Sequence, residues 1–256
     1  MKALQFMAEN KMAVNEIEKP EIGPDEVLLA ARSVGICHSD IELLEGRYII
    51  PFSYPIIPGH EWSAEVIEVG SKVSTLKAGD RVVGECVIGM EHFGFSISGA
   101  MAEFFIAKET WLHKIPAEVS WTAGALVEPF SCGYYAAQQA DNLDASDTVI
   151  VFGAGPIGLG VVAAANAKGA RVIIAEPSKE RAEVAKKLGA EAVFDPSAAD
   201  AVEQAMKLTD GIGATVVFEA SGKPQAMAMT LEVAAFRARL VNIGIDVGGS
   251  ATAKLG

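Results

Sequence analysis

Residues 148–158, with the sequence TVIVFGAGPIG, constrain the fold of this chain more than any other stretch. A short apolar run with β-branched side chains leads into a turn that contains Gly153, Gly155 and Gly158, and small apolar residues follow. This pattern predicts a strand, a tight turn and a helix. In a dinucleotide-binding unit the first glycine permits the turn and the second lets the backbone approach a pyrophosphate. The third lets the helix pack closely on the strand.

A second expected strand, at residues 171–175, supports a nucleotide site. It ends in Glu176, 23 residues after Gly153, close to the spacing of about 20 residues at which a carboxylate meets the adenosine ribose. A 2′-phosphate would be repelled there, so NAD is expected rather than NADP. Arg181 is expected to cover the adenine rather than to bind a phosphate. The residues expected to bind NAD are Gly153, Gly155, Pro156, Ile157, Gly158, Glu176 and Arg181.

Two alternatives compete with this interpretation. A glycine-rich turn in an unrelated α/β domain would explain the glycines alone, but the strand, the helix, the second strand and its terminal acid all favour nucleotide binding. Residues 148–167 carry no charge and are long enough for a membrane span. Four glycines and Pro156 interrupt this segment and Lys168 follows it, so we reject the span.

Composition and charge narrow the class of partner. With 256 residues, of which 50% are hydrophobic, the chain can hold one large domain or two ordinary ones. A net charge of −12 opposes nucleic acid or an anionic membrane as the main partner and suits a small neutral substrate. The cysteines, Cys37, Cys86 and Cys132, are too scattered for a disulfide framework, and the first residues lack the apolar core of a signal peptide. Both observations favour a cytoplasmic location.

The chain divides into two parts with different patterns. Up to residue 115, short segments alternate apolar and polar positions between clusters of glycine, proline and aspartate, which predicts a mostly antiparallel β domain. Residues 116–140 are expected to form helical connectors. From residue 148, strands alternate with helices, which predicts an α/β fold with a doubly wound parallel sheet. Strands are expected at 148–152, 171–175, 191–194, 214–219 and 239–244, and helices at 157–168, 178–188, 198–208 and 224–235.

Two polar clusters in the β domain suit a metal ion. Cys37, Ser39 and Asp40 lie in GICHSD, and His60 and Glu61 lie in PGHE. A thiolate, an imidazole and a carboxylate match zinc in charge and softness, and three protein ligands with an open position are typical of a catalytic site. Each residue alone is more often a small buried hydrophobe or a solvated polar group. The zinc interpretation is favoured because the nucleotide-binding half of the chain needs a reacting centre, and these two clusters would supply it.

Several motifs, in order along the chain, resemble those of the zinc-dependent medium-chain dehydrogenases, particularly the polyol (sorbitol dehydrogenase-like) branch. They are GICHSD, PGHEWSAEVIEVGSKV, KAGDRVV, GAMAEF and VFGAGPIGLG. The resemblance implies a GroES-like β domain over residues 1–130 with one catalytic zinc, and a Rossmann domain over 131–256 with NAD. The active site would lie in the cleft between them. The implied reaction transfers a hydride between a polyol or secondary alcohol and NAD and forms a ketone or ketose.

The same resemblance assigns roles to single residues. Cys37, His60 and Glu61 match the catalytic zinc ligands. Ser39 matches the hydroxyl that relays the substrate proton, and Asp40 matches the acid that orients the histidine ligand.

Glu128 stands where alcohol-specific relatives have a cysteine ligand and where polyol dehydrogenases have a glutamate. By the resemblance it either binds zinc directly or reaches it through a water. The alternative is a charged residue at the start of a helix. Cys132 matches a position that faces the nicotinamide in relatives, and we expect it to serve packing rather than ligation.

The chain departs from that family at two places. Relatives insert a lobe with four cysteines for a structural zinc, whereas here CVIG runs directly into MEHFGF. Relatives also continue past the fifth strand of the coenzyme domain. The resemblance therefore predicts a Rossmann domain that is incomplete at its C-terminus, with an uncapped sheet edge after residues 239–244. We expect such a chain, whether a natural miniature, an engineered reduction or a fragment, to keep NAD binding better than turnover.

Two other functions compete with the enzyme hypothesis. The chain could be an NAD-binding sensor without turnover, or an inactive scaffold with the same fold. Zinc content separates the scaffold from the other two, and turnover separates the enzyme from the sensor. The patterns leave the particular alcohol open. Relatives commonly pair through the last strands of the coenzyme domain. The oligomeric state of this chain therefore stays open, with a homo-oligomer, either a dimer or a tetramer, as the possibility.

Overall fold

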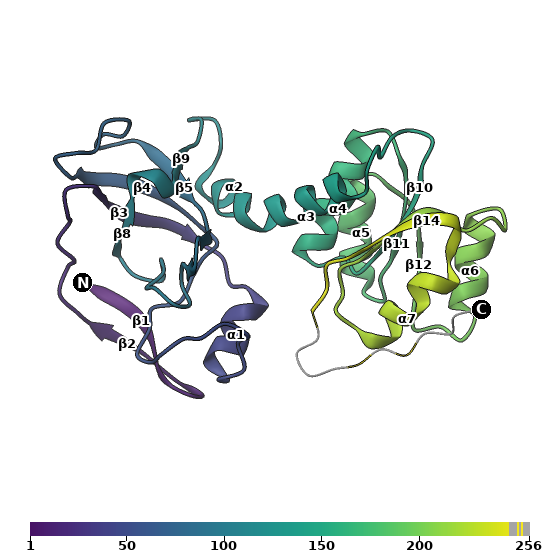
Figure 1. Cartoon of the computed structure of the whole chain (residues 1–256), viewed down its shortest axis with the longest axis horizontal. Helices are drawn as coiled ribbons and strands as arrows, with labels where there is room; N and C mark the ends of the chain where they lie inside the picture. The colour runs from purple at the N-terminus through teal and green to yellow at the C-terminus, as the bar shows by residue number, and fades with distance from the viewer. Residues whose placement is uncertain (246–249, 251, 253–256) are drawn as a thin grey trace. The chain divides into compact units, whose positions relative to one another are not determined.

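The computed structural model describes residues 1–245, 250 and 252 (Figure 1). The chain forms two compact units, Met1–Glu128 and Pro129–Gly256, called here the N-terminal unit and the C-terminal unit. The domain boundary expected from the sequence, between residues 130 and 131, lies two residues further along the chain.

The N-terminal unit consists mostly of antiparallel strands. The strands are β1 (Lys2–Ala8), β2 (Lys11–Glu16), β3 (Glu26–Val34), β4 (Trp62–Val69), β5 (Arg81–Gly84), β6 (Val87–Ile88), β7 (Glu91–His92), β8 (Phe104–Lys108) and β9 (Leu112–Lys114). The helices are α1 (His38–Leu44), the 3-10 helix η1 (Glu109–Trp111) and α2 (Trp121–Ala125). Five strands form one antiparallel sheet in the order β8-β3-β4-β5-β9. This confirms the antiparallel domain predicted from the alternating apolar and polar positions.

Aromatic and branched side chains fill the core beneath this sheet. Trp62, the first residue of β4, meets Phe105 edge-on with ring centroids 4.8 Å apart, and it meets Phe93 at 5.6 Å. Val27 and Leu29 enter the same core from β3, because alternate residues of a strand share one face. Val34, the last residue of β3, packs against this core and pairs with Trp62, so the end of β3 lies beside the start of β4, and the candidate metal site is built from these two ends.

A tight hairpin lies where the sequence lacks a cysteine-rich lobe. Strands β6 and β7 pair Val87 with His92 and Ile88 with Glu91, so the connection between the strands is very short. Gly89 in this connection has a φ of +64°, a left-handed conformation that glycine adopts without steric cost. A single tight turn between β6 and β7 therefore stands at the position of the cysteine-rich lobe.

The C-terminal unit is a parallel sheet with helices packed on its faces. The strands are β10 (Thr148–Phe152), β11 (Arg171–Ala175), β12 (Ala190–Phe194), β13 (Ala214–Glu219) and β14 (Ala234–Asn242). The helices are α3 (Val127–Gln139), whose first two residues belong to the N-terminal unit, α4 (Pro156–Ala167), α5 (Lys179–Lys187), α6 (Ala201–Leu208) and α7 (Pro224–Glu232). All strand pairs are parallel, in the order β12-β11-β10-β13-β14. This confirms the doubly wound sheet, and α2 and α3 confirm the helical connectors expected at 116–140.

Alternate residues of β10 enter two separate cores. Val149 and Val151 pack with residues of α3, α4 and α5 on one face of the sheet. Ile150 and Phe152 pack with residues of α6 and α7 on the other face. A strand that is buried on both faces reads as a continuous apolar run, which is why residues 149–152 are hydrophobic throughout. The central place of β10 brings the glycine turn to the middle of the sheet edge.

The uncharged segment 148–167 is not a membrane span, because it divides into strand β10 and helix α4. None of the helices in the described ranges has both the length and the apolar character that crossing a bilayer requires.

The last strand differs from its expected bounds. It begins at Ala234 rather than at 239, and α7 ends at Glu232 rather than at 235. Ala234 already pairs with Ala214, whereas Arg239 pairs with Val216, so β14 carries extra residues between these two pairs. Extra residues of this kind interrupt the regular pattern of side chains along a strand, so the sequence did not indicate that β14 starts at Ala234. The sheet edge predicted beyond residue 244 involves residues that mostly lie outside the described part of the chain.

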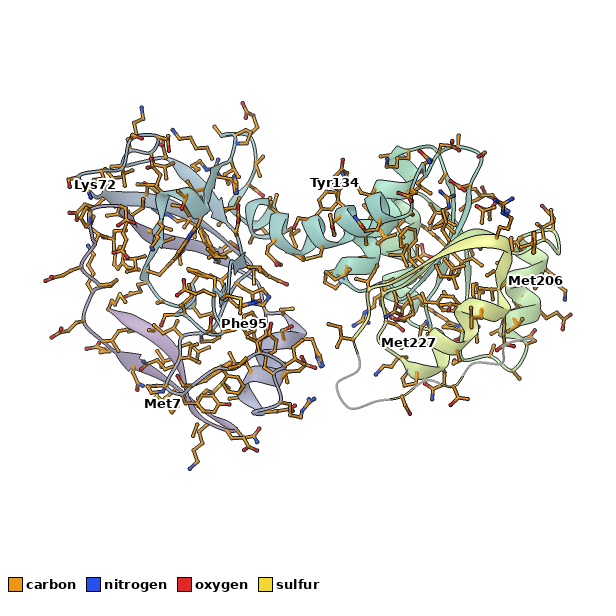
Figure 2. The ribbon with its side chains drawn as sticks, in the orientation of Figure 1. Met7, Lys72, Phe95, Tyr134, Met206 and Met227 are labelled. Atoms are coloured by element: carbon orange, nitrogen blue, oxygen red, sulfur yellow. The ribbon has the colours of Figure 1, made fainter. Side chains whose placement is uncertain are left out.

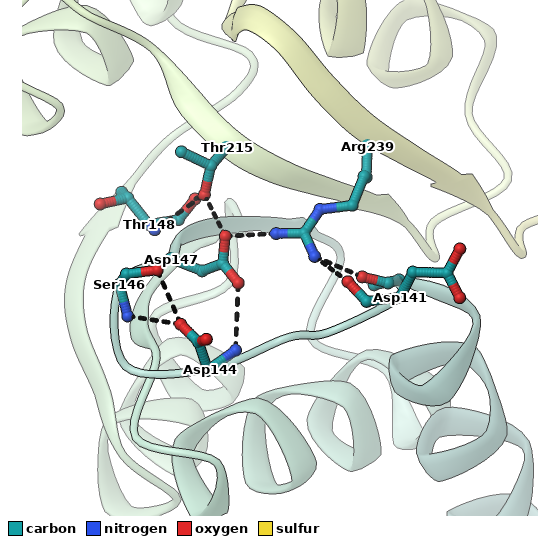
Figure 3. A network of polar contacts seen from close by, with 8 residues as sticks. Asp141, Asp144, Ser146, Asp147, Thr148, Thr215 and Arg239 are labelled. Carbon is teal, nitrogen blue, oxygen red and sulfur yellow. Dashed lines mark hydrogen bonds and ion pairs between the residues drawn. The ribbon is translucent and has the colours of Figure 1, made fainter.

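A polar network ties β14 to the loop before β10 (Figure 3). The Arg239 guanidinium donates to the carbonyl oxygens of Ala140 and Asp141 and to the carboxylate of Asp147. The Thr215 hydroxyl donates to the same Asp147 oxygen at 2.8 Å, and the Asp144 N–H donates to the other at 3.1 Å. Arg239 thereby holds the register of the last described strand.

Candidate active site

Three potential metal ligands come from two adjoining ends of the N-terminal sheet. Cys37 is the N-cap of α1, shortly after β3, while His60 and Glu61 directly precede β4. The N–H of Gly35 donates to the carbonyl oxygen of Glu61 at 2.7 Å and joins the two ends. Gly59, with a φ of +99°, makes the turn before His60 in a conformation that favours glycine. The local backbone thus brings together residues that are more than twenty positions apart.

The ligand atoms of this group fit a metal ion. The Cys37 sulfur, a His60 ring nitrogen and a Glu61 carboxylate oxygen all lie within 4.8 Å of one another, so these residues could hold a metal ion. His60 and Glu61 are buried. A thiolate, an imidazole and a carboxylate are zinc ligands of the catalytic type, and three of them leave a position for another ligand. The predicted zinc group is therefore compatible with the structure.

The electrostatics of the group favour a positive charge. Burial lowers the pKa of His60, but the Asp40 carboxylate and the Cys37 thiol outweigh burial and raise it to about 10. Burial raises the pKa of Glu61, and His60 opposes this shift. The groups that stabilise a proton on His60 would also stabilise a metal cation at the same place.

Asp40 lies in the position expected of an orienting acid. Its Oδ2 accepts the N–H of Cys37 at 2.9 Å, and its Oδ1 lies 3.7 Å from Nδ1 of His60. That separation is longer than a hydrogen bond. Within the described part of the chain, Oδ1 of Asp40 and Nδ1 of His60 are buried without a hydrogen-bond partner. Such unpartnered atoms are rare in folded proteins, and this facing pair suits an acid that orients a histidine ligand.

Ser39 and Glu128 border this group. The Ser39 hydroxyl lies 3.7 Å from the Cys37 sulfur, in the first turn of α1. Glu128, in the first turn of α3, is not one of the three clustered ligands. Burial raises the pKa of Glu128, His60 lowers it, and Glu61 raises it further, so Glu128 feels the charges of the metal group. Cys132 is exposed on α3 and also lies outside the three-residue group.

Sequence analysis missed an aromatic stack beside the metal group. Phe95, labelled in Figure 2, has ring contacts with both Tyr48 and His60. The Tyr48 ring stacks on Phe95 with centroids 4.2 Å apart, and the His60 ring is 4.6 Å away from it. Burial raises the pKa of Tyr48 above its usual range. No local motif indicates this stack, because its members come from three distant segments.

The glycine turn of the C-terminal unit opens onto a pocket of about 620 Å³. Gly153 and Gly155 line it, and an added Cβ at Gly155 would meet no protein atom within 4 Å. Gly153 has a φ of +94°, and an added Cβ at Gly158 would collide with the Gly153 carbonyl oxygen. The geometry at the three glycines is compatible with the three uses expected of them, and coenzyme binding at this turn stays a prediction. Pro156 and Ile157 are the first residues of α4, which begins one residue earlier than expected.

Glu176 and Arg181 line the same pocket. The two Glu176 oxygens accept the N–H of Ala154 at 2.8 Å and the N–H of Ser178 at 2.9 Å. The acid therefore holds the glycine turn as well as facing the pocket. Further lining residues that the sequence motif did not indicate are Ser197, Ala220, Ser221, Lys223 and Gln225. They follow β12 and β13, for which no motif was recognised.

Two family models match the chain. The alcohol dehydrogenase GroES-like domain matches residues 23–117, and the zinc-binding dehydrogenase domain matches residues 156–255. Together with the ligand group and the glycine turn, they define a zinc-dependent dehydrogenase of two domains.

Similar proteins agree with this class. A D-arabitol-phosphate dehydrogenase from Enterococcus avium is 34% identical over 256 residues, which cover 92% of this chain and 72% of that protein. A (R,R)-butanediol dehydrogenase from Bacillus subtilis is 35% identical, with coverage of 96% and 78%. A sorbitol dehydrogenase from Halalkalibacterium halodurans is 32% identical, with coverage of 91% and 73%. The chain belongs to the zinc-dependent medium-chain dehydrogenases, in their polyol branch.

Solved structures share the fold. A zinc-binding dehydrogenase from Sinorhizobium meliloti bound to NADP superposes with a TM-score of 0.92 at 27% identity, covering 100% of this chain and 79% of that one. The 2R,3R-butanediol dehydrogenase from Bacillus subtilis has a TM-score of 0.87 at 33% identity, with coverage of 97% and 78%. The GroES-like and Rossmann folds predicted by the resemblance are confirmed.

Proposed function

We propose that this protein transfers a hydride between a polyol or secondary alcohol and NAD and so interconverts the alcohol with a ketone or ketose. The observation that carries the proposal is the clustering of Cys37, His60 and Glu61 within 4.8 Å in a chain that also has a glycine-turn pocket. The names of the similar proteins support an alcohol or polyol as the substrate.

The metal-binding part of the proposal assigns zinc to the three clustered residues, with Glu128 as a direct or water-bridged fourth partner. The chemistry that zinc supplies at such a donor set is Lewis acidity, which lowers the pKa of a substrate hydroxyl. Oxidation of a neutral alcohol needs this help, because an unactivated hydroxyl holds its proton far above neutral pH. Glu128 is half-buried at the start of α3, where its carboxylate is affected by the charge of His60.

The protein's own residues position and move protons in this proposal. Asp40 would hold the His60 ring in its ligating orientation, since its Oδ1 faces Nδ1 of His60 at 3.7 Å. Ser39, 3.7 Å from the Cys37 sulfur, would take the proton from the substrate hydroxyl and pass it towards solvent. The short helix α1 carries both residues, so a single element sets their spacing.

The coenzyme part of the proposal assigns NAD to the pocket at the glycine turn. The coenzyme supplies the hydride acceptor, while the protein fixes its position. The free N–H groups at the start of α4 would bind the pyrophosphate, and the bare backbone at Gly155 would allow its close approach. Glu176 would accept the ribose hydroxyls and repel a 2′-phosphate. Arg181 would cover the adenine.

The substrate in this proposal is small and neutral, in line with the net charge of −12. The cytoplasmic location expected from the scattered cysteines stays a prediction, and so does a homo-oligomer.

Zinc quantification and a turnover assay on the purified chain test this function together. We expect one zinc per chain and NAD reduction with at least one compound from a panel of sorbitol, arabitol, 2,3-butanediol and simple secondary alcohols. One zinc with NAD binding but no turnover would instead indicate the sensor. A folded chain that holds no zinc would indicate the inactive scaffold.

A further inference from the structure

Two buried glutamates end the strands on either side of β10 in the same way. Glu176 directly follows β11 and Glu219 ends β13, and each begins a Glu-X-Ser sequence. In both, a carboxylate oxygen accepts the backbone N–H two residues later, from Ser178 at 2.9 Å and from Ser221 at 2.8 Å. Both side chains are more than nine-tenths buried. The repeat suggests a shared task at the turns that follow these strands.

Glu219 holds its turn with additional contacts. Its Oε1 also accepts the hydroxyl of Ser221, and its Oε2 accepts the N–H of Gly222 at 3.2 Å. The Ser221 oxygen in turn accepts the N–H of Lys223 at 3.2 Å. The backbone from residue 220 to residue 223 is thereby organised around one buried carboxylate.

This turn forms a wall of the coenzyme pocket. Ala220, Ser221 and Lys223 line the pocket, whereas Glu219 lies behind them and does not. The turn also packs on the first glycine of the nucleotide turn, because an added Cβ at Gly153 would lie 3.0 Å from the Ser221 Cβ. A shift of residues 220–223 would therefore change both the shape of the pocket and the support of the glycine turn.

We infer that Glu219 is a positioning residue for coenzyme binding, which acts through Ser221 and Gly222 without touching the coenzyme. The inference rests on the proposed function and deepens it. Glu176 faces the pocket and holds the glycine turn directly. Glu219, on the other side of β10, holds the turn at residues 220–223. The two acids together hold the loops that flank the nucleotide.

The chemistry of the carboxylate explains why a close substitute should fail. Glu219 presents two acceptor oxygens to three donors. Glutamine keeps the shape but replaces one oxygen with an NH₂ group, which would face an N–H donor and could not accept it. A buried N–H without an acceptor is costly, so the turn would move to relieve it. Aspartate keeps both acceptors but is one methylene shorter.

The experiment titrates NAD into the wild type, Glu219→Gln, Glu219→Asp and the matched control Glu232→Gln, at a temperature well below each thermal midpoint. Glu232 is an exposed residue at the end of α7, so its substitution removes the same charge elsewhere in the unit. We expect the Kd for NAD to rise about tenfold in Glu219→Gln, to rise less in Glu219→Asp, and to stay within about twofold of wild type in the control.

A steady-state assay adds a second measure. We expect the KM for NAD to rise about tenfold in Glu219→Gln while kcat at saturating NAD changes less than about threefold, because bound coenzyme restores the turn. A purely structural role would lower the thermal midpoint but leave the NAD affinity of the folded protein unchanged, and this result would overturn the inference. Tighter NAD binding by Glu219→Gln would also overturn it. Such a result would mean that the negative charge of Glu219 only repels the coenzyme phosphates.

Two further outcomes keep the test decisive. If Glu219→Gln does not fold, the Kd of Glu219→Asp decides, and a value equal to wild type would overturn the inference. A wild-type protein that binds neither NAD nor NADP would overturn the proposed function, whereas normal wild-type binding with unaffected variants would overturn only the role of Glu219.

Discussion

The metal group of the N-terminal unit and the nucleotide turn of the C-terminal unit are built from different parts of the chain. Side chains make the metal group, whose ligand atoms converge from Cys37, His60 and Glu61. Backbone makes the nucleotide turn, where glycines leave space for a ligand or for another segment. Their buried acids differ as well. In the described structure, Oδ1 of Asp40 lacks a hydrogen-bond partner, whereas both oxygens of Glu176 accept backbone N–H groups.

This difference separates a group that awaits a ligand from one that holds the fold. A buried polar atom without a partner is costly, so Oδ1 of Asp40 facing Nδ1 of His60 indicates an acid that orients the imidazole of a zinc-type ligand. A buried carboxylate whose oxygens are satisfied by N–H groups instead stabilises a particular backbone. We therefore expect function in the N-terminal unit to depend on single side chains, and function in the C-terminal unit to depend on backbone shape.

The largest effect should follow Cys37→Ser. A serine hydroxyl is not ionised at neutral pH and replaces a thiolate ligand poorly, so zinc should fall from one per chain to nearly none. Turnover should fall at least about 1,000-fold, or ~4 kcal/mol. NAD affinity should stay unchanged, because the coenzyme pocket is built from the other unit. Zinc quantification, an NAD titration and a turnover assay measure the three effects.

Cys132→Ser is the matched control, since it removes an exposed thiol outside the metal group and should leave the zinc content unchanged. Two zincs per wild-type chain, or full zinc occupancy in Cys37→Ser, would contradict the assignment.

The glycine turn and most of the parallel sheet could be predicted because their signals are local. The apolar run 149–152, the glycines and the acid at Glu176 lie within one short segment, and each has a distinct physical reason. The irregular start of β14 could not be predicted, because it depends on pairing with Ala214 on another strand. Helix and strand ends elsewhere differed by a few residues at most.

The metal ligands could be predicted only in part from residue chemistry, and the resemblance supplied the rest. Cys37 and His60 are far apart in sequence, so their proximity depends on the pairing of β3 with β4. The Phe95 stack and Glu219 were missed, because a single aromatic or acidic residue carries no local signal of its surroundings. Contacts between distant segments thus mark the limit of what these motifs indicate.

The next effect compares the same added methyl group at two glycines. Gly158→Ala should lower the free energy of unfolding by about 2–3 kcal/mol, because the new Cβ collides with the Gly153 carbonyl oxygen. Gly155→Ala should change it by less than about 1 kcal/mol, because no protein atom lies within 4 Å of its Cβ. NAD affinity should nevertheless fall at least about tenfold in Gly155→Ala, where the methyl group occupies the approach of the pyrophosphate.

Chemical denaturation and NAD titration of both variants measure this difference. Normal NAD affinity in Gly155→Ala would show that the bare backbone at this position does not face the coenzyme.

A smaller effect concerns the choice of coenzyme. The Glu176 carboxylate should repel a 2′-phosphate, so the wild type should bind NAD at least about tenfold more tightly than NADP, or ~1.4 kcal/mol. The similar Sinorhizobium meliloti structure is bound to NADP, which makes the comparison informative within this fold. Titration of the two coenzymes under the same salt conditions measures the ratio. Equal affinities would contradict the role given to Glu176.

The smallest effect should come from Asp147, whose satisfied carboxylate contrasts with that of Asp40. Burial raises the pKa of Asp147, but hydrogen bonds from Arg239 and Thr215 outweigh burial and hold its pKa below the usual range. A pKa that is lower in the folded state contributes stability above the unfolded-state value, near pH 4, and this contribution is lost as the pH falls through the folded value. Asp147→Asn should therefore lower the free energy of unfolding by about 1 kcal/mol at pH 7.

That deficit relative to wild type should shrink as the pH falls below about 4, because the Asp147 carboxylate takes up a proton first in the unfolded chain and only at lower pH in the folded protein. Urea denaturation of both proteins between pH 7 and pH 3 measures the change. Glu191→Gln is the control, because it removes an exposed carboxylate paired with Arg171, and surface pairs of this kind contribute about 0.5 kcal/mol. A deficit that stays constant over this pH range would mean that the Arg239 network holds β14 by shape alone, and the charge of Asp147 would then have no part in it.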